Sequence, residues 1–273
     1  MLGRIKNNAL FQRAYHLSGF DSAYHFLWAF LGAVRYGFPS RHIKVIGVTG
    51  TKGKSTTLEF VNAAFEGAGK KTALLSSIRV KVGEVTEKNM TGNTMPGRAY
   101  IEQFLDRAVR AGCEYAFVEV TSQGAVMHRH RFIRWAAALV TNIAPEHIEA
   151  HGSFENYRAA KLSFLRHAVR GGARVFLNQE DQGLEWFFQS LPAEKTSFYS
   201  KELIRDARSP VFDIFPGDFN RENIAGAVAC ARAMGIEEES IWKGLAMVKG
   251  IPGRLEFVMQ KPFAVVLDYA HTP

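Results

Sequence analysis

A glycine-rich turn at residues 50–56 has the residue types that hold a polyphosphate. It reads Gly-Thr-Lys-Gly-Lys-Ser-Thr and joins an apolar run to a helical pattern. Backbone N–H groups at the start of a helix, together with the positive end of the helix dipole, bind phosphate groups. Lys54 would reach the β- and γ-phosphates, and the Ser55 hydroxyl would bind a magnesium ion. The expected nucleotide-binding residues of this turn are Gly50, Thr51, Lys52, Gly53, Lys54, Ser55 and Thr56.

This turn differs by one residue from the strict P-loop pattern GxxxxGK[ST]. Val48 stands where that pattern has its first glycine, and Gly47 lies one residue too early. A glycine turn that only joins a strand to a helix is the alternative, but it does not explain a Gly-Lys-Ser sequence at the start of a helix. We therefore expect the turn to bind a nucleotide.

Two further segments carry groups that could act beside this turn. Glu119 ends a β-branched run and could either cap a helix or, next to a nucleotide, supply a hard oxygen ligand to magnesium. Residues 141–151 read Thr-Asn-Ile-Ala-Pro-Glu-His-Ile-Glu-Ala-His and bring two histidines and two carboxylates into one loop. A lone histidine is usually a satisfied polar residue. Two at this spacing favour a contact with a metal ion or a phosphate.

The elements that must position these residues alternate along the chain from residue 44 onward. Short apolar, β-branched runs predict strands at 45–48, 72–75, 115–120, 136–141, 173–177 and 263–267. Helical periodicity predicts helices at 55–67, 98–111, 154–169, 220–234 and 238–248. Strands that are apolar throughout are typical of parallel sheets covered on both faces. The chain is therefore predicted to have an α/β fold, a mostly parallel sheet flanked by helices.

Two consequences follow from this predicted sheet. Residues 78–85 alternate between apolar and polar side chains and contain a glycine, which predicts a small exposed hairpin. Ligands of open parallel sheets bind at the carboxyl ends of the strands. The turn at 50–56, Glu119 and the loop at 141–151 all follow predicted strands, so we expect them to meet at one edge.

The bulk composition is that of an ordinary soluble globular protein. The 273 residues are 47% hydrophobic and 22% charged, which excludes disordered and fibrous classes. Cys113 and Cys230 form no CxxC pair, so neither a disulfide framework nor a zinc site is indicated, and a reducing cytoplasm is favoured. A net charge of +8 suits a nucleotide, a nucleic acid or an anionic membrane. No nucleic-acid-binding motif accompanies the basic residues, so we expect no nucleic-acid partner.

The first 43 residues are expected to form a separate basic, aromatic and helical segment. Residues 1–44 carry six basic residues against Asp21 alone, and residues 26–34 are uniformly apolar. That run is much shorter than the ~20 residues that span a bilayer, and no signal-peptide cleavage site follows it. A helix packed on the domain is the favoured interpretation. The alternative is an interfacial helix within residues 20–41, with Arg13, Arg35 and Arg41 near lipid headgroups.

A set of motifs in fixed order extends the argument beyond the glycine-rich turn. They are GTKGKST, EVTS, TN, EHIEAHGSFENYRAAK, FNRENIAGA, IPGRLE and DYAHTP. In this order they resemble the Mur ligases, most closely the MurE type, which adds an amino acid to a UDP-N-acetylmuramoyl dipeptide. The resemblance covers residues 43–273 and implies a P-loop NTPase-like central ATPase domain over residues 44–273. It also implies that the family's C-terminal ligase domain is absent from this chain.

The resemblance implies an ATP-dependent ligation in peptidoglycan biosynthesis. A carboxylate of the muramoyl dipeptide would attack the γ-phosphate to form an acyl phosphate, which the amino group of the added amino acid would capture, with release of ADP and phosphate. Lys54 and two magnesium ions would neutralise charge on the transferred phosphoryl group. The implied metal ligands are Ser55, Glu119, His147 and Lys161, and the implied catalytic group is Lys54, Glu119, His147 and Lys161.

Lys161 is implied to carry CO₂ as a carbamate that holds magnesium. A solvated lysine on an amphipathic helix is the alternative, because carbamylation requires a neutral amine. The resemblance also places Asn142, Asn223, Arg254 and Asp268 at the nucleotide, and Thr94, Thr121 and Arg129 at the muramoyl substrate. Asn223 could instead be a polar-face or capping residue of its helix.

The sequence departs from the family pattern in the loop and in the substrate motifs. Lys52 replaces an asparagine, and Met95 and Met127 replace a threonine and a glutamine that could form hydrogen bonds. No uridine-binding domain precedes Lys44, so the substrate could carry either UDP or a lipid. Because a closing domain completes the site in such ligases, we expect this chain to bind Mg-ATP but to ligate poorly alone, unless a partner chain completes the site.

Two other functions stay open. One is a nucleotide-binding module that assembles on a partner chain and has no independent catalysis. The other is a ligase with a different acceptor, as in the folylpolyglutamate and cyanophycin synthetases. Either ligase would act in the cytoplasm, at the inner membrane surface if the segment at 20–41 contacts lipid.

Overall fold

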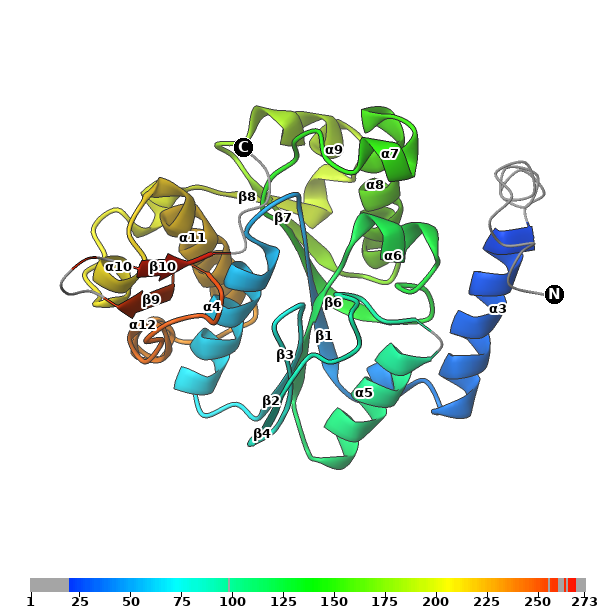
Figure 1. The fold of residues 1–273 in the computed structure, drawn as a ribbon, viewed down its shortest axis with the longest axis horizontal. Helices are drawn as coiled ribbons and strands as arrows, with labels where there is room; N and C mark the ends of the chain where they lie inside the picture. The colour runs from blue at the N-terminus through cyan, green and yellow to red at the C-terminus, as the bar shows by residue number, and fades with distance from the viewer. Residues whose placement is uncertain (1–19, 98, 255, 260–262, 264, 269–273) are drawn as a thin grey trace.

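The computed structural model describes residues 20–97, 99–254, 256–259, 263 and 265–268 (Figure 1). A central sheet has the strand order β4-β3-β2-β5-β1-β6-β7-β8. Strands β2, β5, β1, β6, β7 and β8 run parallel, and β3 and β4 extend the β2 edge as an antiparallel hairpin. The strands are β1 (Lys44–Thr49), β2 (Thr72–Leu75), β3 (Arg79–Val82), β4 (Val85–Lys88), β5 (Tyr115–Glu119), β6 (Trp135–Val140), β7 (Arg174–Asn178) and β8 (Thr196–Tyr199).

Helices cover both faces of this sheet (Figure 1). The α-helices are α3 (Phe20–Arg35), α4 (Lys54–Gly67), α5 (Tyr100–Arg110), α6 (Ser122–Val126), α7 (Ile148–His151), α8 (Phe154–Arg170), α9 (Glu185–Gln189), α10 (Val211–Ile214), α11 (Asp218–Ala233) and α12 (Glu238–Ala246). Short 3₁₀ turns are η1 (Pro39–Arg41), η2 (Gln182–Leu184), η3 (Ala193–Lys195) and η4 (Lys201–Ile204). Helices α4, α11 and α12 pack on one face, and α5, α6 and α8 pack on the other.

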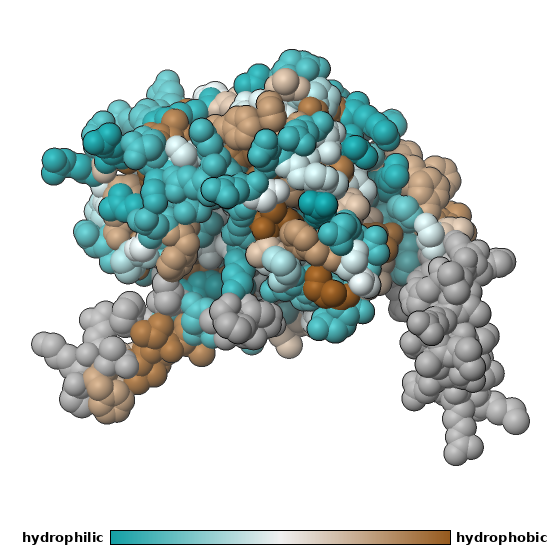
Figure 2. Space-filling model, turned by 90° about the horizontal axis from the view of Figure 1, so that it is seen from above, coloured by the Kyte–Doolittle hydropathy of each residue, from teal (hydrophilic) through white to brown (hydrophobic). Residues whose placement is uncertain are grey.

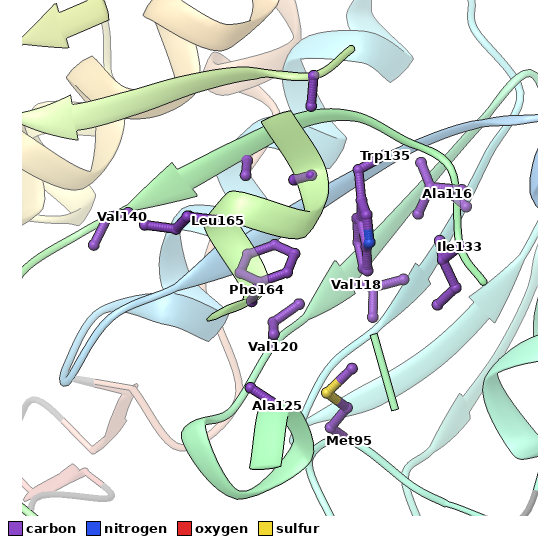
Figure 3. Packing of buried hydrophobic residues seen from close by; sticks show 14 of the residues in the cluster. Met95, Ala116, Val118, Val120, Ala125, Ile133, Trp135, Val140, Phe164 and Leu165 are labelled. Carbon is purple, nitrogen blue, oxygen red and sulfur yellow. The ribbon is translucent and has the colours of Figure 1, made fainter. Parts of the chain in front are cut away.

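The core between the sheet and α8 explains why a glycine precedes the phosphate loop. An added Cβ at Gly47, in the middle of β1, would lie 2.7 Å from Phe164 and 2.8 Å from Trp135. These two rings pack edge to face with their centroids 5.0 Å apart (Figure 3). Gly47 is therefore needed for packing inside the sheet, and it is not a displaced P-loop glycine.

Most of the predicted elements are confirmed. The first five predicted strands and the five predicted helices are all present, with ends shifted by at most two residues. The hairpin is also present, and its second strand extends three residues further than predicted, to Lys88. The predicted strand at 263–267 was wrong as a member of the main sheet. Its described part is β10 (Val265–Leu267), which is exposed and pairs antiparallel with β9 (Glu256–Met259) in a separate two-stranded sheet. Strand β8 was not predicted, because only Tyr199 of its four residues is buried.

Helix α3 lies at the edge of the molecule beside α5 (Figure 1). Packing on the domain was the favoured prediction for this segment, and it is confirmed for the small residues Ala29, Gly32 and Ala33, which are buried. The large apolar side chains of the same helix are exposed, which that prediction did not anticipate. Within the part of the chain that the structure describes, no helix is long and apolar enough to cross a membrane.

Candidate functional site

The turn at 50–56 lies where the strand order changes direction. β1 pairs with β5 on one side and with β6 on the other, although β2 follows it in the chain. The loops after β1, β5 and β6 therefore meet at the carboxyl edge of the sheet, which is the ligand position of open α/β sheets. As predicted, this edge brings together the phosphate loop, Glu119 and the loop that begins at Thr141.

Two glycines of the phosphate loop have conformations that favour glycine. Gly53 caps the start of α4 with a φ of 79°, and an added Cβ would lie 2.5 Å from the Asn223 side-chain oxygen. Gly50 has a φ of 146°, and an added Cβ would collide with the Thr141 hydroxyl. Both positions need glycine because a positive φ is strained for other residues and because neighbouring side chains fill the space.

The loop after β6 holds the phosphate loop in place. The Asn142 side-chain oxygen accepts hydrogen bonds from the backbone N–H groups of Thr51, at 3.1 Å, and Lys52, at 2.8 Å. The Thr141 hydroxyl donates to the Lys52 carbonyl oxygen at 2.6 Å. Asn142 was predicted as a nucleotide contact. In this structure its carboxamide forms hydrogen bonds with the loop backbone, so it positions the loop.

Oxygen atoms converge on the carboxylate of Glu119. The Ser55 hydroxyl donates to Glu119 Oε2 at 2.9 Å, and the Ser77 backbone N–H donates to the same atom at 3.0 Å. The Ser77 hydroxyl lies 2.9 Å from the Ser55 hydroxyl. Glu119 is only 2% exposed. One carboxylate and two hydroxyls form a hard oxygen donor set of the kind that magnesium prefers.

Two buried amines face the backbone of the phosphate loop. Lys54 Nζ donates to the Thr51 carbonyl oxygen, and Lys161 Nζ donates to the Gly50 carbonyl oxygen, each at 2.7 Å. Burial lowers the pKa of Lys54, an effect that the carboxylates Glu119 and Glu146 oppose. Burial lowers the pKa of Lys161 well below its usual range, and the positive charge of Lys54 lowers it further. Lys161 is thus predisposed to carry a neutral amine.

The loop histidines lie around Tyr157, one turn before Lys161 on α8. The Tyr157 hydroxyl is 3.0 Å from the Thr51 hydroxyl, which ties α8 to the phosphate loop. The ring of His147 lies 6.3 Å from the Tyr157 ring, and its Nε2 is 3.7 Å from a Glu146 oxygen. His151 Nε2 is 3.0 Å from the Ser122 hydroxyl. His147 is exposed, so a bound ligand could reach it without a movement of the backbone.

The predicted nucleotide-side residues divide into two groups. Asn223 is buried against Gly53, and its side-chain oxygen accepts a hydrogen bond from the Thr57 hydroxyl at 3.0 Å. Arg254 Nη2 lies 3.5 Å from the Ser55 hydroxyl, so its guanidinium is at the phosphate loop. Asp268 follows β10 and is exposed. The structure therefore brings Asn223 and Arg254 to the loop.

The predicted substrate-side residues lie around α6. The Thr121 hydroxyl caps this helix by accepting from the Gly124 N–H at 3.0 Å. Arg129 donates to the Met95 carbonyl oxygen and to the Met127 sulfur. Desolvation lowers the pKa of Arg129. Both methionines that depart from the family motif therefore contact the same guanidinium. Thr94 is half-buried beside Met95.

Sequence reasoning missed the hydroxyls of Ser77 and Tyr157 at this site. Ser77 follows the predicted strand at 72–75, so the rule that places ligands at the carboxyl ends of strands could have found it. Tyr157 lies within the YRAAK motif, but the local sequence gives no indication that its hydroxyl contacts Thr51. Among the described residues, no group of three or more His, Cys, Asp or Glu side chains could hold a metal ion. The carboxylate and hydroxyl set at Glu119 is the donor set that fits magnesium.

Comparisons with known proteins agree with this geometry. The Mur ligase middle domain family matches residues 48–208. The UDP-N-acetylmuramoyl-L-alanyl-D-glutamate--2,6-diaminopimelate ligase of Syntrophomonas wolfei is 33% identical over 90% of this chain and 54% of its own length. The UDP-N-acetylmuramyl-tripeptide synthetase of Roseiflexus is 31% identical over 89% of this chain and 54% of its own. The chain thus spans about half the length of these relatives.

A solved structure shows the same fold at lower identity. MurF from Acinetobacter baumannii has a TM-score of 0.67 and 22% identity, with 89% of this chain and 54% of that chain covered. At this level of identity the likeness shows a shared fold, a mostly parallel α/β sheet with flanking helices.

Proposed function

Because the chain belongs to the Mur ligase family, we propose that it forms the ATP-binding and phosphoryl-transfer centre of an acid–amino-acid ligase that extends a muramoyl peptide. The observation that carries the proposal is the convergence of Lys54, Ser55, Glu119 and Lys161 on one glycine loop at the carboxyl edge of the sheet. The product class is a peptidoglycan precursor, and the compartment is the cytoplasm.

The proposed reaction has two steps. A carboxylate oxygen of the acceptor peptide attacks the γ-phosphorus of ATP, the bond from that phosphorus to the ADP oxygen breaks, and an acyl phosphate forms. The amino nitrogen of the added amino acid then attacks the acyl carbon, and phosphate leaves as the amide bond forms and the amine loses a proton. The first step places most of its developing charge on the phosphoryl oxygens, where preorganised positive groups are effective.

The residues of this chain would bind and orient the triphosphate. The N–H groups at the start of α4, behind Gly53, point at bound phosphate. Lys54 would exchange its bond to the Thr51 carbonyl for phosphate oxygens, which its burial makes favourable. Arg254 would add a second positive charge from the side of Ser55.

Magnesium fits the oxygen atoms at Glu119. Ser55 and Glu119 would hold one ion, and His147 with a carbamylated Lys161 would hold a second, so that the ions supply charge neutralisation when bound. Lys161 suits carbamylation because its buried amine has a lowered pKa. His147 would have to turn from Glu146, and its exposed position allows this.

The muramoyl substrate is the least constrained part of the proposal. Thr94, Thr121 and Arg129 would contact it, but Met95 and Met127 occupy the surroundings of Arg129. We propose that the substrate carries either UDP or a lipid, with residues 1–43 as a unit separate from the ATPase domain at 44–273. Asp268 would contact the ribose. Closure of the site by a further domain or a partner chain belongs to the same proposal. Contact of residues 20–41 with the membrane would be a property of that segment and does not depend on the ligase reaction.

The test measures substrate-dependent ADP release by the longest natural form of the protein. Mg-ATP would be supplied with UDP-N-acetylmuramoyl-L-alanyl-D-glutamate and, one at a time, diaminopimelate, lysine and other amino acids. The expected result is ADP release that needs both the peptide and one amino acid and that Lys54→Ala abolishes. This chain by itself is expected to bind Mg-ATP without rapid turnover.

Two results would replace the proposal. ADP release with a folate and glutamate, but not with the muramoyl dipeptide, would favour the other acceptor class. This combination is included because the chain shares its fold with the Escherichia coli FolC structure. ATP binding with no turnover under any combination, and unchanged in Lys161→Ala, would favour a binding module.

A further inference from the structure

Helix α3 packs on the domain with its large apolar side chains facing outward. Its buried residues are the small ones, Ala29, Gly32 and Ala33. The side chains of seven larger apolar residues on the same helix are between 40% and 52% exposed: Tyr24, Phe26, Leu27, Trp28, Phe30, Leu31 and Val34. A helix that is held by the hydrophobic effect buries its large apolar residues. This one keeps them in solvent, and apolar atoms mark that edge of the surface (Figure 2).

Close packing fixes this orientation. An added Cβ at Gly32 would lie 2.5 Å from the Ala99 Cβ at the start of α5. The Ser22 hydroxyl is 2.8 Å from His128 Nε2, and the Phe26 ring lies 5.8 Å from the His128 ring. Rotation of α3 about its axis would break these contacts and force larger side chains against α5. The orientation of the apolar face is therefore held by the close approach of Gly32 to Ala99 and by the contacts of Ser22 and Phe26 with His128.

The apolar face continues into a basic cleft. The ring of Phe132 packs edge to face on Phe26 and Phe30, with centroids 5.2 and 5.4 Å away. Phe132 also lines a cleft of about 550 Å³ beside η1. The positive groups that line this cleft are Arg41, Arg134 and Arg170.

The segments that line the cleft carry no carboxylate. Residues 22–58, 120–145 and 156–178, which supply α3 from Ser22 onward, η1, the cleft and most of α8, contain no Asp or Glu. The buried Glu102 of α5 lies near Gly32 of α3 and does not line the cleft. The side chain of Arg41 lies over the Phe38 ring at 4.5 Å, which leaves its charge at the rim of the cleft. An apolar face rich in aromatic rings thus adjoins an uncompensated positive cleft.

We propose that α3 and this cleft form a docking surface for a bilayer that contains anionic phospholipid. The apolar side chains would enter the boundary between headgroups and acyl chains, and the arginines would contact lipid phosphates. Tyr24 and Trp28 have the amphipathic rings that favour this boundary. The proposal does not depend on the ligase reaction, because none of these residues belongs to the phosphate site.

Charge favours lipid over a second copy of the chain. A symmetric dimer through α3 would bring two sets of cleft arginines to one interface, where like charges repel. An anionic bilayer instead neutralises both the rim and the cleft. Each arginine near such a surface strengthens binding by about fivefold.

The test is co-sedimentation of the full chain with vesicles of phosphatidylcholine, with and without 30% phosphatidylglycerol. Leu27→Ser with Leu31→Ser removes exposed apolar area, and Arg41→Gln with Arg134→Gln removes cleft charge. The matched controls are Val85→Ser with Met247→Ser, also exposed apolar residues, and Arg110→Gln with Arg205→Gln, also exposed arginines. We expect binding to anionic vesicles only, a loss of at least about tenfold in each test variant, and no change in either control.

A second measurement reports whether α3 itself enters the lipid. Brominated lipid should quench tryptophan fluorescence in the wild type, and Trp28→Phe should remove that quenching while vesicle binding persists. Of the other three tryptophans, Trp135 is buried in the domain core, and Trp186 and Trp242 belong to α9 and α12, which lie away from α3 (Figure 1). Equal binding to neutral vesicles, or no binding, would overturn the proposal. Concentration-dependent dimers that Leu27→Ser with Leu31→Ser abolishes would assign the face to a second copy. Inorganic phosphate bound in the cleft, without vesicle binding, would assign it to a soluble anion.

Discussion

The amine of Lys161 donates a 2.7 Å hydrogen bond to the carbonyl oxygen of Gly50, although 111 positions separate the two residues in the sequence. The bond joins α8 to the first residue of the phosphate loop inside the protein. A buried amine is costly to charge, so the protein holds a lysine at the phosphate site in a state that favours its neutral form. A neutral amine is the form of lysine that reacts with CO₂, so the fold prepares Lys161 for the proposed carbamylation.

Lys161 is expected to take up CO₂ near neutral pH. Carbamylation consumes the neutral amine, and the pKa of this lysine is lowered by burial and by Lys54, so the neutral fraction at pH 7 to 8 exceeds that of a surface lysine. The carbamate signal in ¹³C NMR with labelled bicarbonate should grow as pH rises and disappear on acidification. Lys161→Met should remove the signal and Lys71→Met, at an exposed lysine, should retain it. A signal that survives in Lys161→Met would refute the assignment.

Glu119→Gln should weaken magnesium-dependent ATP binding. The amide keeps the shape and can still accept from Ser55 and Ser77, but it loses the negative charge that attracts the cation. We expect a loss of about 2 kcal/mol, roughly thirtyfold in Kd for Mg-ATP by calorimetry, with little change for ATP in excess EDTA. Glu114→Gln, an exposed carboxylate just before the same strand, is the control. Equal losses with and without magnesium would assign Glu119 a structural role only.

Gly53→Ala should destabilise the protein more than Gly69→Ala does. Both residues have a positive φ, 79° and 71°, but only at Gly53 would the added Cβ meet a neighbour, the Asn223 side-chain oxygen. Gly69→Ala should cost about 1 kcal/mol in free energy of unfolding from backbone strain. Gly53→Ala should cost at least about 2 kcal/mol more. Urea denaturation measures both.

A double variant separates the collision from the strain. Asn223→Ala removes the obstacle, so the Gly53→Ala cost should shrink when the two changes are combined. Strict additivity of the two costs would show that the packing of Gly53 against Asn223 is not the source of the difference.

Glu102→Gln should stabilise the protein at alkaline pH. Burial raises the pKa of Glu102 to about 7, above its ordinary value of 4.5, and the small cavity around it also holds His25 and Arg129. Between pH 4.5 and 7 the unfolded chain loses this proton while the folded chain keeps it, so stability falls as pH rises through that window. The penalty above pH 7 is about 3 kcal/mol, which the neutral glutamine avoids. Chemical denaturation at pH 4.5 and 8 should show the difference only at the higher pH.

The control for this carboxylate is Glu87→Gln on the exposed strand β4. It should leave the pH dependence of stability unchanged. A wild-type stability that rises from pH 4.5 to 7 in step with Glu102 ionisation would contradict the sign of the prediction.

Local patterns in the sequence were sufficient to predict most of the helices and strands and the phosphate loop. The alternation of apolar runs and helical periods identified β1, β5 and β6, and the rule for open parallel sheets predicted Glu119 beside the loop. These features depend on residues close together in the chain, so periodicity and motif spacing report them.

Tertiary structure decided which distant groups meet and which face of a helix is covered. The strand-end rule can place Ser77 at this edge, but nothing local indicates that it bonds Glu119 or that Tyr157 bonds Thr51. Each pair is joined only through the packing of separate strands and helices. The strand at 263–267 is apolar like a core strand, yet its described residues pair outside the main sheet and stay exposed. In α3 the close approach of Gly32 to Ala99 turns the large apolar side chains outward. The hydrophobic pattern of a segment shows which of its residues are apolar. Only the packing of neighbouring elements decides whether that apolar surface is covered and by what.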